Sequence, residues 1–135
     1  WDTRILATDI SHQALAKAQA GSYPLPADMP DAWRKRYFIQ DKSGDTYTVA
    51  PTIKQNVIFR TFNLMDPIRF RLKFDVIFCR NVMIYFDLET RNALVSRFWE
   101  ALNPWGHLVI SHSESLGQNP HFRMVAPAIY QRRSM

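Results

Sequence analysis

Polar side chains that could carry out chemistry follow one apolar segment of the chain. Residues 74–79 form an apolar run of strand length, and Arg80, Asn81 and Tyr85 come directly after it. Ligands of open parallel α/β sheets bind outside the carboxyl ends of the strands, so these three side chains would lie beside a ligand. An arginine and a tyrosine there could steer an anionic group. The alternative is a strand-to-helix loop with incidental polar residues.

A second candidate, Asp9, closes the apolar segment at residues 4–10. Doubly wound folds place at such a strand end the carboxylate that accepts hydrogen bonds from a ribose diol, about 20 residues after a glycine-rich loop. Only eight residues precede Asp9, and the four glycines are too far apart to form that loop. We therefore expect the loop to lie before residue 1, or the cofactor site to be incomplete. The simpler alternative is that Asp9 only neighbours a helix cap.

Other chemistries have weaker support. His107 and His112 are an odd number of positions apart in one expected strand, so they should point to opposite faces and cannot share a metal. No Gly-x-Ser-x-Gly elbow surrounds Ser111, which leaves a hydrolase triad without an anchor. The single cysteine, Cys79, lies in the apolar run. We interpret it as a small buried hydrophobe rather than a nucleophile, and it fits a reducing cytoplasm.

Composition indicates one domain. The chain has 135 residues, of which 47% are hydrophobic, enough for a single core. No apolar stretch approaches the roughly 20 residues of a membrane helix, so we expect a soluble, cytoplasmic protein. The formal charge of +5 favours acidic partners. Charge alone leaves nucleic acid, an anionic membrane and an acidic protein surface open.

Periodicity predicts strands that alternate with helices, and hence a largely parallel sheet with helices on its faces and an antiparallel edge. The run at 74–79 should be covered on both faces. Ser11 should cap a helix that ends near Gln19, and Asp87 one that ends near Asn103. The expected strands are residues 4–10, 56–62, 74–79 and 107–111, a hairpin of 36–40 with 45–50, and a terminal antiparallel pair of 121–125 with 128–132.

Five segments follow one another in this order: Ile5-Leu6-Ala7-Thr8-Asp9-Ile10-Ser11, Asn63-Leu64-Met65, the run from Phe74 to Asp87, His112-Ser113-Glu114-Ser115-Leu116, and the closing Tyr130-Gln131-Arg132-Arg133. In this order they resemble the CheR family of chemotaxis receptor glutamate methyltransferases. The resemblance extends over nearly the whole chain. It implies an enzyme that uses S-adenosylmethionine to methylate glutamate side chains of chemoreceptors, leaving S-adenosylhomocysteine.

The resemblance also implies a fold and a domain plan. It is a Rossmann-like class I methyltransferase fold of the α/β class, with a small antiparallel β-subdomain inserted at about residues 34–52. The first central strand of that sheet would be absent, so residues 1–135 would form an incomplete domain. The gap would fall between the strands that end at Asp9 and at Arg80 and would leave backbone groups unpaired. We expect a missing segment or a second chain to complete the sheet.

Site residues follow from the same resemblance. The residue that matches Asp9 binds the ribose hydroxyls, and the tyrosine that matches Tyr85 lies near the transferred methyl group. The residues that match Asn63 and Leu64 contact the adenosine, and those that match Cys79 and Arg80 complete the wall of the cofactor site. We expect Arg80 and Tyr85 to act in catalysis. We expect no metal, because a sulfonium is already an activated methyl donor and glutamate is ionised near neutral pH.

Partners implied by the family are the cytoplasmic helices of chemoreceptors, with a peptide on the edge of the β-subdomain. We expect no nucleic acid partner and no membrane insertion. One rival is a non-catalytic receptor- or peptide-binding module that uses the same hairpin for edge addition. A nucleic-acid methyltransferase ranks lower, because no Asp-Pro-Pro-Tyr-like base-handling motif follows residue 79.

Overall fold

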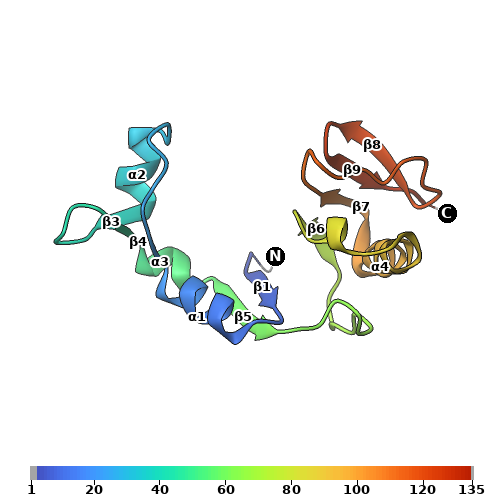
Figure 1. The fold of residues 1–135 in the computed structure, drawn as a ribbon, viewed down its shortest axis with the longest axis horizontal. Helices are drawn as coiled ribbons and strands as arrows, with labels where there is room; N and C mark the ends of the chain where they lie inside the picture. The colour runs from blue at the N-terminus through green and yellow to red at the C-terminus, as the bar shows by residue number, and fades with distance from the viewer. Residues whose placement is uncertain (1–2, 135) are drawn as a thin grey trace. The chain divides into compact units, whose positions relative to one another are not determined.

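The chain folds into two compact units that divide between Asn63 and Leu64 (Figure 1). A computed structural model describes residues 3–134. The first unit contains β1 (Ile5–Asp9), α1 (His12–Ala20), β2 (Ser22–Tyr23), α2 (Asp31–Tyr37), β3 (Phe38–Gln40), β4 (Tyr47–Val49), α3 (Pro51–Lys54) and β5 (Val57–Thr61). The second contains β6 (Phe74–Phe78), the 3-10 turn η1 (Met83–Tyr85), α4 (Leu88–Ala101), β7 (Leu102–Val109), β8 (Phe122–Ala126) and β9 (Ile129–Arg132).

In the first unit, β1 and β5 form a parallel pair whose carboxyl ends coincide. Asp9 lies opposite Thr61 at the last position of the pair. The helix α1 follows β1 directly, because the Ser11 side chain accepts a hydrogen bond from the Ala14 N–H at 3.2 Å and so caps it. It ends at Gly21, whose φ of 65° is the left-handed conformation that glycine adopts freely. The predicted strand, cap and helix end are confirmed.

The same unit carries the small antiparallel sheet, in the strand order β2-β4-β3. One carboxylate, that of Asp41, accepts hydrogen bonds from the hydroxyls of Thr46, Ser22 and Thr48, at 2.5, 2.8 and 2.9 Å. These bonds, with that of Thr46 the strongest influence, hold the pKa of Asp41 below its ordinary value. The carboxylate therefore ties the hairpin turn to the outer strand β2.

The hairpin prediction is confirmed at its centre and wrong at its start. Residues 36 and 37 belong to α2 rather than to the first strand. This helix begins after Pro30, and its first turn is held by a 2.7 Å ion pair between Asp31 and Arg34. The strand β2 was not predicted, because two residues carry no periodic pattern.

In the second unit, the strand order is β6-β7-β9-β8. The first pair is parallel and the other two are antiparallel, which confirms the predicted terminal pair. The strand β7 begins at Leu102, five residues before the predicted start, since α4 ends at Ala101. Gly106 is required there, because a Cβ atom would lie 2.9 Å from the Asn103 carbonyl oxygen.

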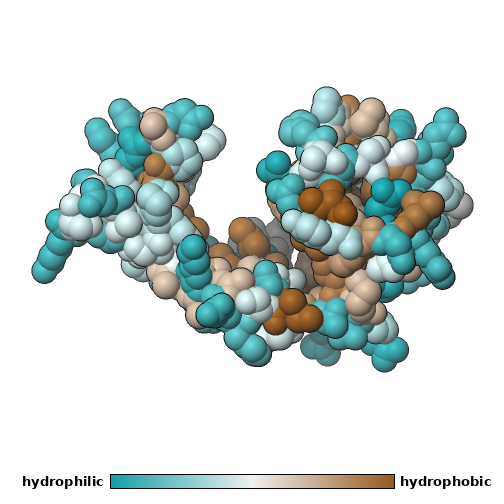
Figure 2. Space-filling model, viewed as in Figure 1, coloured by the Kyte–Doolittle hydropathy of each residue, from teal (hydrophilic) through white to brown (hydrophobic). Residues whose placement is uncertain are grey.

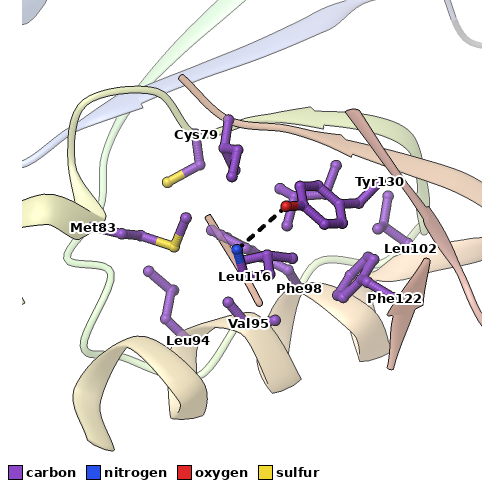
Figure 3. Packing of buried hydrophobic residues seen from close by; sticks show 11 residues of the cluster. Cys79, Met83, Leu94, Val95, Phe98, Leu102, Leu116, Phe122 and Tyr130 are labelled. Atoms are coloured by element: carbon purple, nitrogen blue, oxygen red, sulfur yellow. Dashed lines mark hydrogen bonds between the residues drawn. The ribbon is translucent and has the colours of Figure 1, made fainter. Parts of the chain in front are cut away.

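Buried apolar side chains occur, among the described residues, only in the second unit. The core forms because α4 turns one face toward the sheet, and the Asp87 side chain caps this helix through the Thr90 N–H at 2.8 Å. Figure 3 shows this face meeting residues of the strands and loops, with the Tyr130 hydroxyl 3.4 Å from the Leu116 N–H. The cluster comprises Cys79, Met83, Leu94, Val95, Phe98, Leu102, Leu108, Ile110, Leu116, Phe122 and Tyr130.

The α/β class is confirmed, and one feature of the predicted sheet is corrected. The described strands form three sheets with two parallel pairs and four antiparallel ones, so a single, largely parallel sheet stays a prediction. The strand β6 is not covered on both faces, because Val76 is 45% and Phe78 is 73% exposed. Within residues 3–134, β1 and β6 each pair on one edge alone. Figure 2 shows apolar residues reaching the surface of both units.

No helix among residues 3–134 has both the length and the apolar character that crossing a membrane requires.

Truncating Leu94 to alanine should lower the free energy of unfolding by about 2–5 kcal/mol, because the fully buried side chain leaves a cavity. Leu88→Ala is the matched control. Leu88 lies in the same helix but is 62% exposed, so its truncation should change stability by less than about 0.5 kcal/mol. Urea denaturation measures both, and equal losses would contradict the described core.

Candidate functional site

The corner after β6 presents polar side chains to solvent. Arg80 and Asn81 are exposed, and the turn η1 carries Tyr85, whose side chain is 81% exposed. Asn81 has a φ of 61°, in the left-handed region that asparagine tolerates better than most residues. The second unit therefore brings together three residues that the sequence predicted at a ligand site.

One carboxylate organises this corner. The Glu114 Oε1 atom accepts hydrogen bonds from the N–H groups of Asn81 (3.1 Å) and Ser111 (3.0 Å) and from the Ser111 hydroxyl (2.9 Å). Its Oε2 atom accepts one from the Ile84 N–H at 3.2 Å. Burial raises the pKa of Glu114, but the hydrogen bonds from Ser111, Asn81 and Ile84 outweigh it and leave that pKa below its ordinary value. The carboxylate stays ionised and joins the segments that follow β6 and β7.

Cys79 turns its side chain into the core rather than toward solvent (Figure 3). Its N–H donates to the Val109 carbonyl at 2.9 Å and continues the pairing of β6 with β7. Burial, and secondarily the negative charge of Glu114, raise the pKa of the thiol to about 11. The thiol is therefore protonated at neutral pH and suits packing, not nucleophilic attack. A ligand contact from Cys79 would come from its backbone.

Leu64 lies at the start of the second unit, half-buried against the core cluster. Its carbonyl oxygen accepts a hydrogen bond of 2.5 Å from the Arg97 guanidinium of α4. The sequence analysis did not identify Arg97. The pattern that could have indicated this contact is a long cationic side chain on the half-buried flank of an amphipathic helix, from which it can reach a loop carbonyl.

Asp9 and Asn63 belong to the first unit, at the coincident carboxyl ends of β1 and β5. The Asp9 Oδ1 atom accepts a hydrogen bond from the Ser11 N–H at 2.8 Å, and the Asp9 carbonyl accepts one from the Phe62 N–H at 3.1 Å. The Asp9 carboxylate therefore bonds to the start of α1, and because Asp9 is exposed, the carboxylate also remains accessible to a ligand. The predicted grouping of these two residues with Arg80 stays a prediction.

Two cavities are lined by none of the predicted site residues. One, of about 410 Å³, is lined in the first unit by Asp31, Arg34, Lys35, Phe38, Gln40 and Tyr47. The other, of about 530 Å³, is lined in the second unit by Pro120, Arg123, Gln131, Arg132, Arg133 and Ser134. Across residues 3–134, no three histidine, cysteine or carboxylate side chains gather in a way that could hold a metal ion.

The structure is an α/β fold with polar residues after the carboxyl ends of its parallel strands, the edge at which such folds bind ligands. Residues 1–130 match the family described as CheR methyltransferase, SAM binding domain. The chain therefore belongs to the CheR methyltransferase family, and the resemblance drawn from its motifs is confirmed.

Named relatives agree with this assignment. The chain is 41% identical over 132 residues to the chemotaxis protein methyltransferase of Borreliella burgdorferi, an alignment that covers 96% of this chain and 46% of that protein. It is 38% identical over 135 residues to chemotaxis protein methyltransferase 1 of Pseudomonas aeruginosa, covering 96% and 49%. The probable chemotaxis protein methyltransferase of Rhizobium etli is 40% identical over 126 residues, covering 90% and 47%. The chain spans about half the length of these relatives.

The raised pKa of Cys79 predicts a loss of stability in alkaline solution. The unfolded thiol ionises near its ordinary pKa of 9.0 and the folded thiol near 11, so the unfolded chain releases its proton first. The free energy of unfolding should therefore fall as the pH rises from 9 to 11, by on the order of 2 kcal/mol. Cys79→Ala should lack this component, which urea denaturation of both proteins between pH 8 and 11 would measure. Parallel pH profiles would contradict the assignment.

Proposed function

We propose that the protein containing this chain transfers a methyl group from S-adenosylmethionine to glutamate carboxylates of chemoreceptors, in the cytoplasm. The family match over residues 1–130 carries the proposal, because it takes in both candidate strand ends, at Asp9 and at Arg80. The relatives named chemotaxis protein methyltransferase support the reaction class.

The proposed fold is the Rossmann-like class I methyltransferase sheet, completed by a strand between β1 and β6. Two observations support a completed sheet. Both strands lie at the edge of their sheets in the described part of the chain. Apolar side chains on them are exposed, with Ile5 at 59% and Phe78 at 73%. An unpaired strand edge can pair with another strand, and an exposed apolar side chain favours coverage by another element, so we expect a further segment of the protein or a second chain there.

Side chains of this chain fit the cofactor. An exposed carboxylate at a strand end, that of Asp9, suits the two hydroxyls of a ribose. We assign the adenosine to Asn63 and Leu64, and the remaining wall to the backbone of Cys79 and to Arg80. When bound, S-adenosylmethionine would supply a methyl group activated by its positively charged sulfur.

The catalytic task left to the protein is alignment. The substrate carboxylate is ionised near neutral pH, so no proton has to be removed before it attacks. Holding both reactants in line, roughly 3–3.5 Å apart, and excluding water from the carboxylate can supply several kcal/mol of the barrier. In this scheme, Arg80 steers the carboxylate by charge, and the Tyr85 hydroxyl donates a hydrogen bond that positions the reacting oxygen.

Receptor binding is assigned to two surfaces of different chemistry. The cytoplasmic helices of a chemoreceptor would supply the glutamate at the Arg80 corner. A peptide strand would add to the β-subdomain at β3, which is an edge strand of its sheet within the described residues. The cavity beside β3 is lined by Arg34 and Lys35 and also by Asp31, which pairs with Arg34, so Lys35 leaves it with a net positive charge that favours an acidic peptide. A module that binds peptides without catalysis is not favoured, because the matched family and relatives are methyltransferases.

The reaction class is tested by incubating the intact protein with radiolabelled S-adenosylmethionine and a chemoreceptor cytoplasmic domain. Label should enter the receptor and be released as methanol in mild alkali, because a glutamate methyl ester hydrolyses whereas methylated nitrogen does not. Receptor with the acceptor glutamates changed to alanine is the control. Alkali-stable label, or label in added nucleic acid, would overturn the proposed substrate class.

Arg80→Ala should weaken the binding of S-adenosylhomocysteine by about 10–100-fold, the loss expected for a hydrogen bond to a charged group. Arg69→Ala is the matched control, an exposed loop arginine of the same unit, and should change the dissociation constant less than about twofold. Titration calorimetry measures both constants. Equal affinities of the two variants would remove Arg80 from the site.

A further inference from the structure

Glu114 lies outside the segment after β6 that carries the proposed catalytic side chains of Arg80 and Tyr85, yet its carboxylate accepts hydrogen bonds from the backbone of that segment. Both oxygens are used. Oε1 holds Asn81, which follows Arg80, and Oε2 holds Ile84, which precedes Tyr85. The Ser111 N–H and hydroxyl anchor the same carboxylate to the end of the neighbouring strand β7.

The buried side chains of Cys79 and Met83 anchor this corner to the core, and the Tyr85 and Phe86 N–H groups donate to the Val82 and Met83 carbonyls at 3.2 and 3.0 Å. The turn η1 has no side-chain cap at Val82. Asn81 has a left-handed backbone, which asparagine tolerates better than most residues but which still costs energy, and the Glu114 contact to its N–H stabilises it. The Glu114 carboxylate accepts hydrogen bonds from the Asn81 N–H, just before η1, and from the Ile84 N–H, within it.

We propose that Glu114 is a positioning residue for methyl transfer, which sets the placement of Arg80 and Tyr85 through the backbone on either side of them. This inference rests on the proposed function. Glu114 itself touches neither cofactor nor substrate in the scheme. Its effect on the reaction passes through Tyr85 on the Oε2 side and through Arg80 on the Oε1 side.

The two oxygens allow a selective substitution. In Glu114→Gln, the side-chain carbonyl can keep the three donors at Oε1, while the amide NH₂ replaces Oε2 and faces the Ile84 N–H. Two donors then oppose each other, so the Ile84 contact is lost and the Tyr85 side of the corner loosens. The shape and volume of the side chain hardly change, so the variant should fold.

Hydrogen exchange followed by NMR in the intact protein tests the contact itself. In Glu114→Gln, exchange of the Ile84 amide should speed up about tenfold or more, while that of Asn81 and Ser111 changes less than about threefold. Glu100→Gln is the control, an exposed glutamate on α4 of the same unit, and should alter none of the three. A uniform increase at all three amides would show a merely structural role and overturn the proposal.

Kinetics test the link to Tyr85. Glu114→Gln should lower kcat about tenfold or more, with the KM for S-adenosylmethionine within about threefold, because a small misplacement of a reacting group slows chemistry more than binding. In a Tyr85→Phe background, the same substitution should cost less than about twofold, because the group that it positions has been removed. Equal losses of kcat in both backgrounds, or an unchanged kcat, would overturn the inference.

Measurements on the unaltered protein distinguish a failure of the positioning role from a failure of the proposed function. If it methylates receptors while Glu114→Gln matches it in every readout, the positioning role fails and the proposed function stands. If it neither binds S-adenosylhomocysteine nor methylates receptors, the proposed function fails, and the positioning role fails with it.

Discussion

The geometry of the candidate site depends on one carboxylate that joins two loops. The hydrogen bonds of Glu114 to Asn81, Ile84 and Ser111 fix the segments after β6 and β7 to each other, at the edge where parallel α/β sheets bind ligands. The core beneath is formed by α4 and the sheet, and it takes in the Cys79 side chain. This burial leaves the exposed side chains of Arg80 and Tyr85 to face a ligand. A reaction that depends on aligning two reactants requires polar side chains held in place by a rigid core.

The two units differ in how much apolar surface they bury. The second has its own core, whereas no apolar side chain of the first, among the described residues, is fully buried. Ile5 of β1 and Phe78 of β6 are both exposed, on strands with one unpaired edge in the described part of the chain. A parallel sheet normally buries both faces, so the exposed side chains are the basis for expecting further elements to pack on them, and the unpaired edges are the basis for expecting a further strand.

Much of the fold could be predicted because local signals were strong. Ser11 and Asp87 cap the helices that their side chains predict, and Leu94, Val95 and Phe98 are buried as their helical spacing indicates. The prediction that β6 is buried on both faces was wrong. An apolar run indicates that its side chains favour burial, but not whether another element covers them. The aromatic-rich segment at residues 36–40 indicates a strand throughout, whereas Pro30 and the Asp31–Arg34 pair favour a helix that includes Arg36 and Tyr37.

Part of the candidate site could likewise be predicted from local sequence patterns, and part could not. Arg80 and Tyr85 could be found because polar residues end an apolar run, whereas the contact of Arg97 with Leu64 depends on tertiary structure that no local pattern records.

The most direct test of the account is to record backbone amide spectra of the intact protein while S-adenosylhomocysteine is added. Signals of Asp9, Asn63, Arg80 and Asn81 should shift together, with one dissociation constant. Shifts confined to one of the two strand ends, or to neither, would contradict a cofactor bound by both.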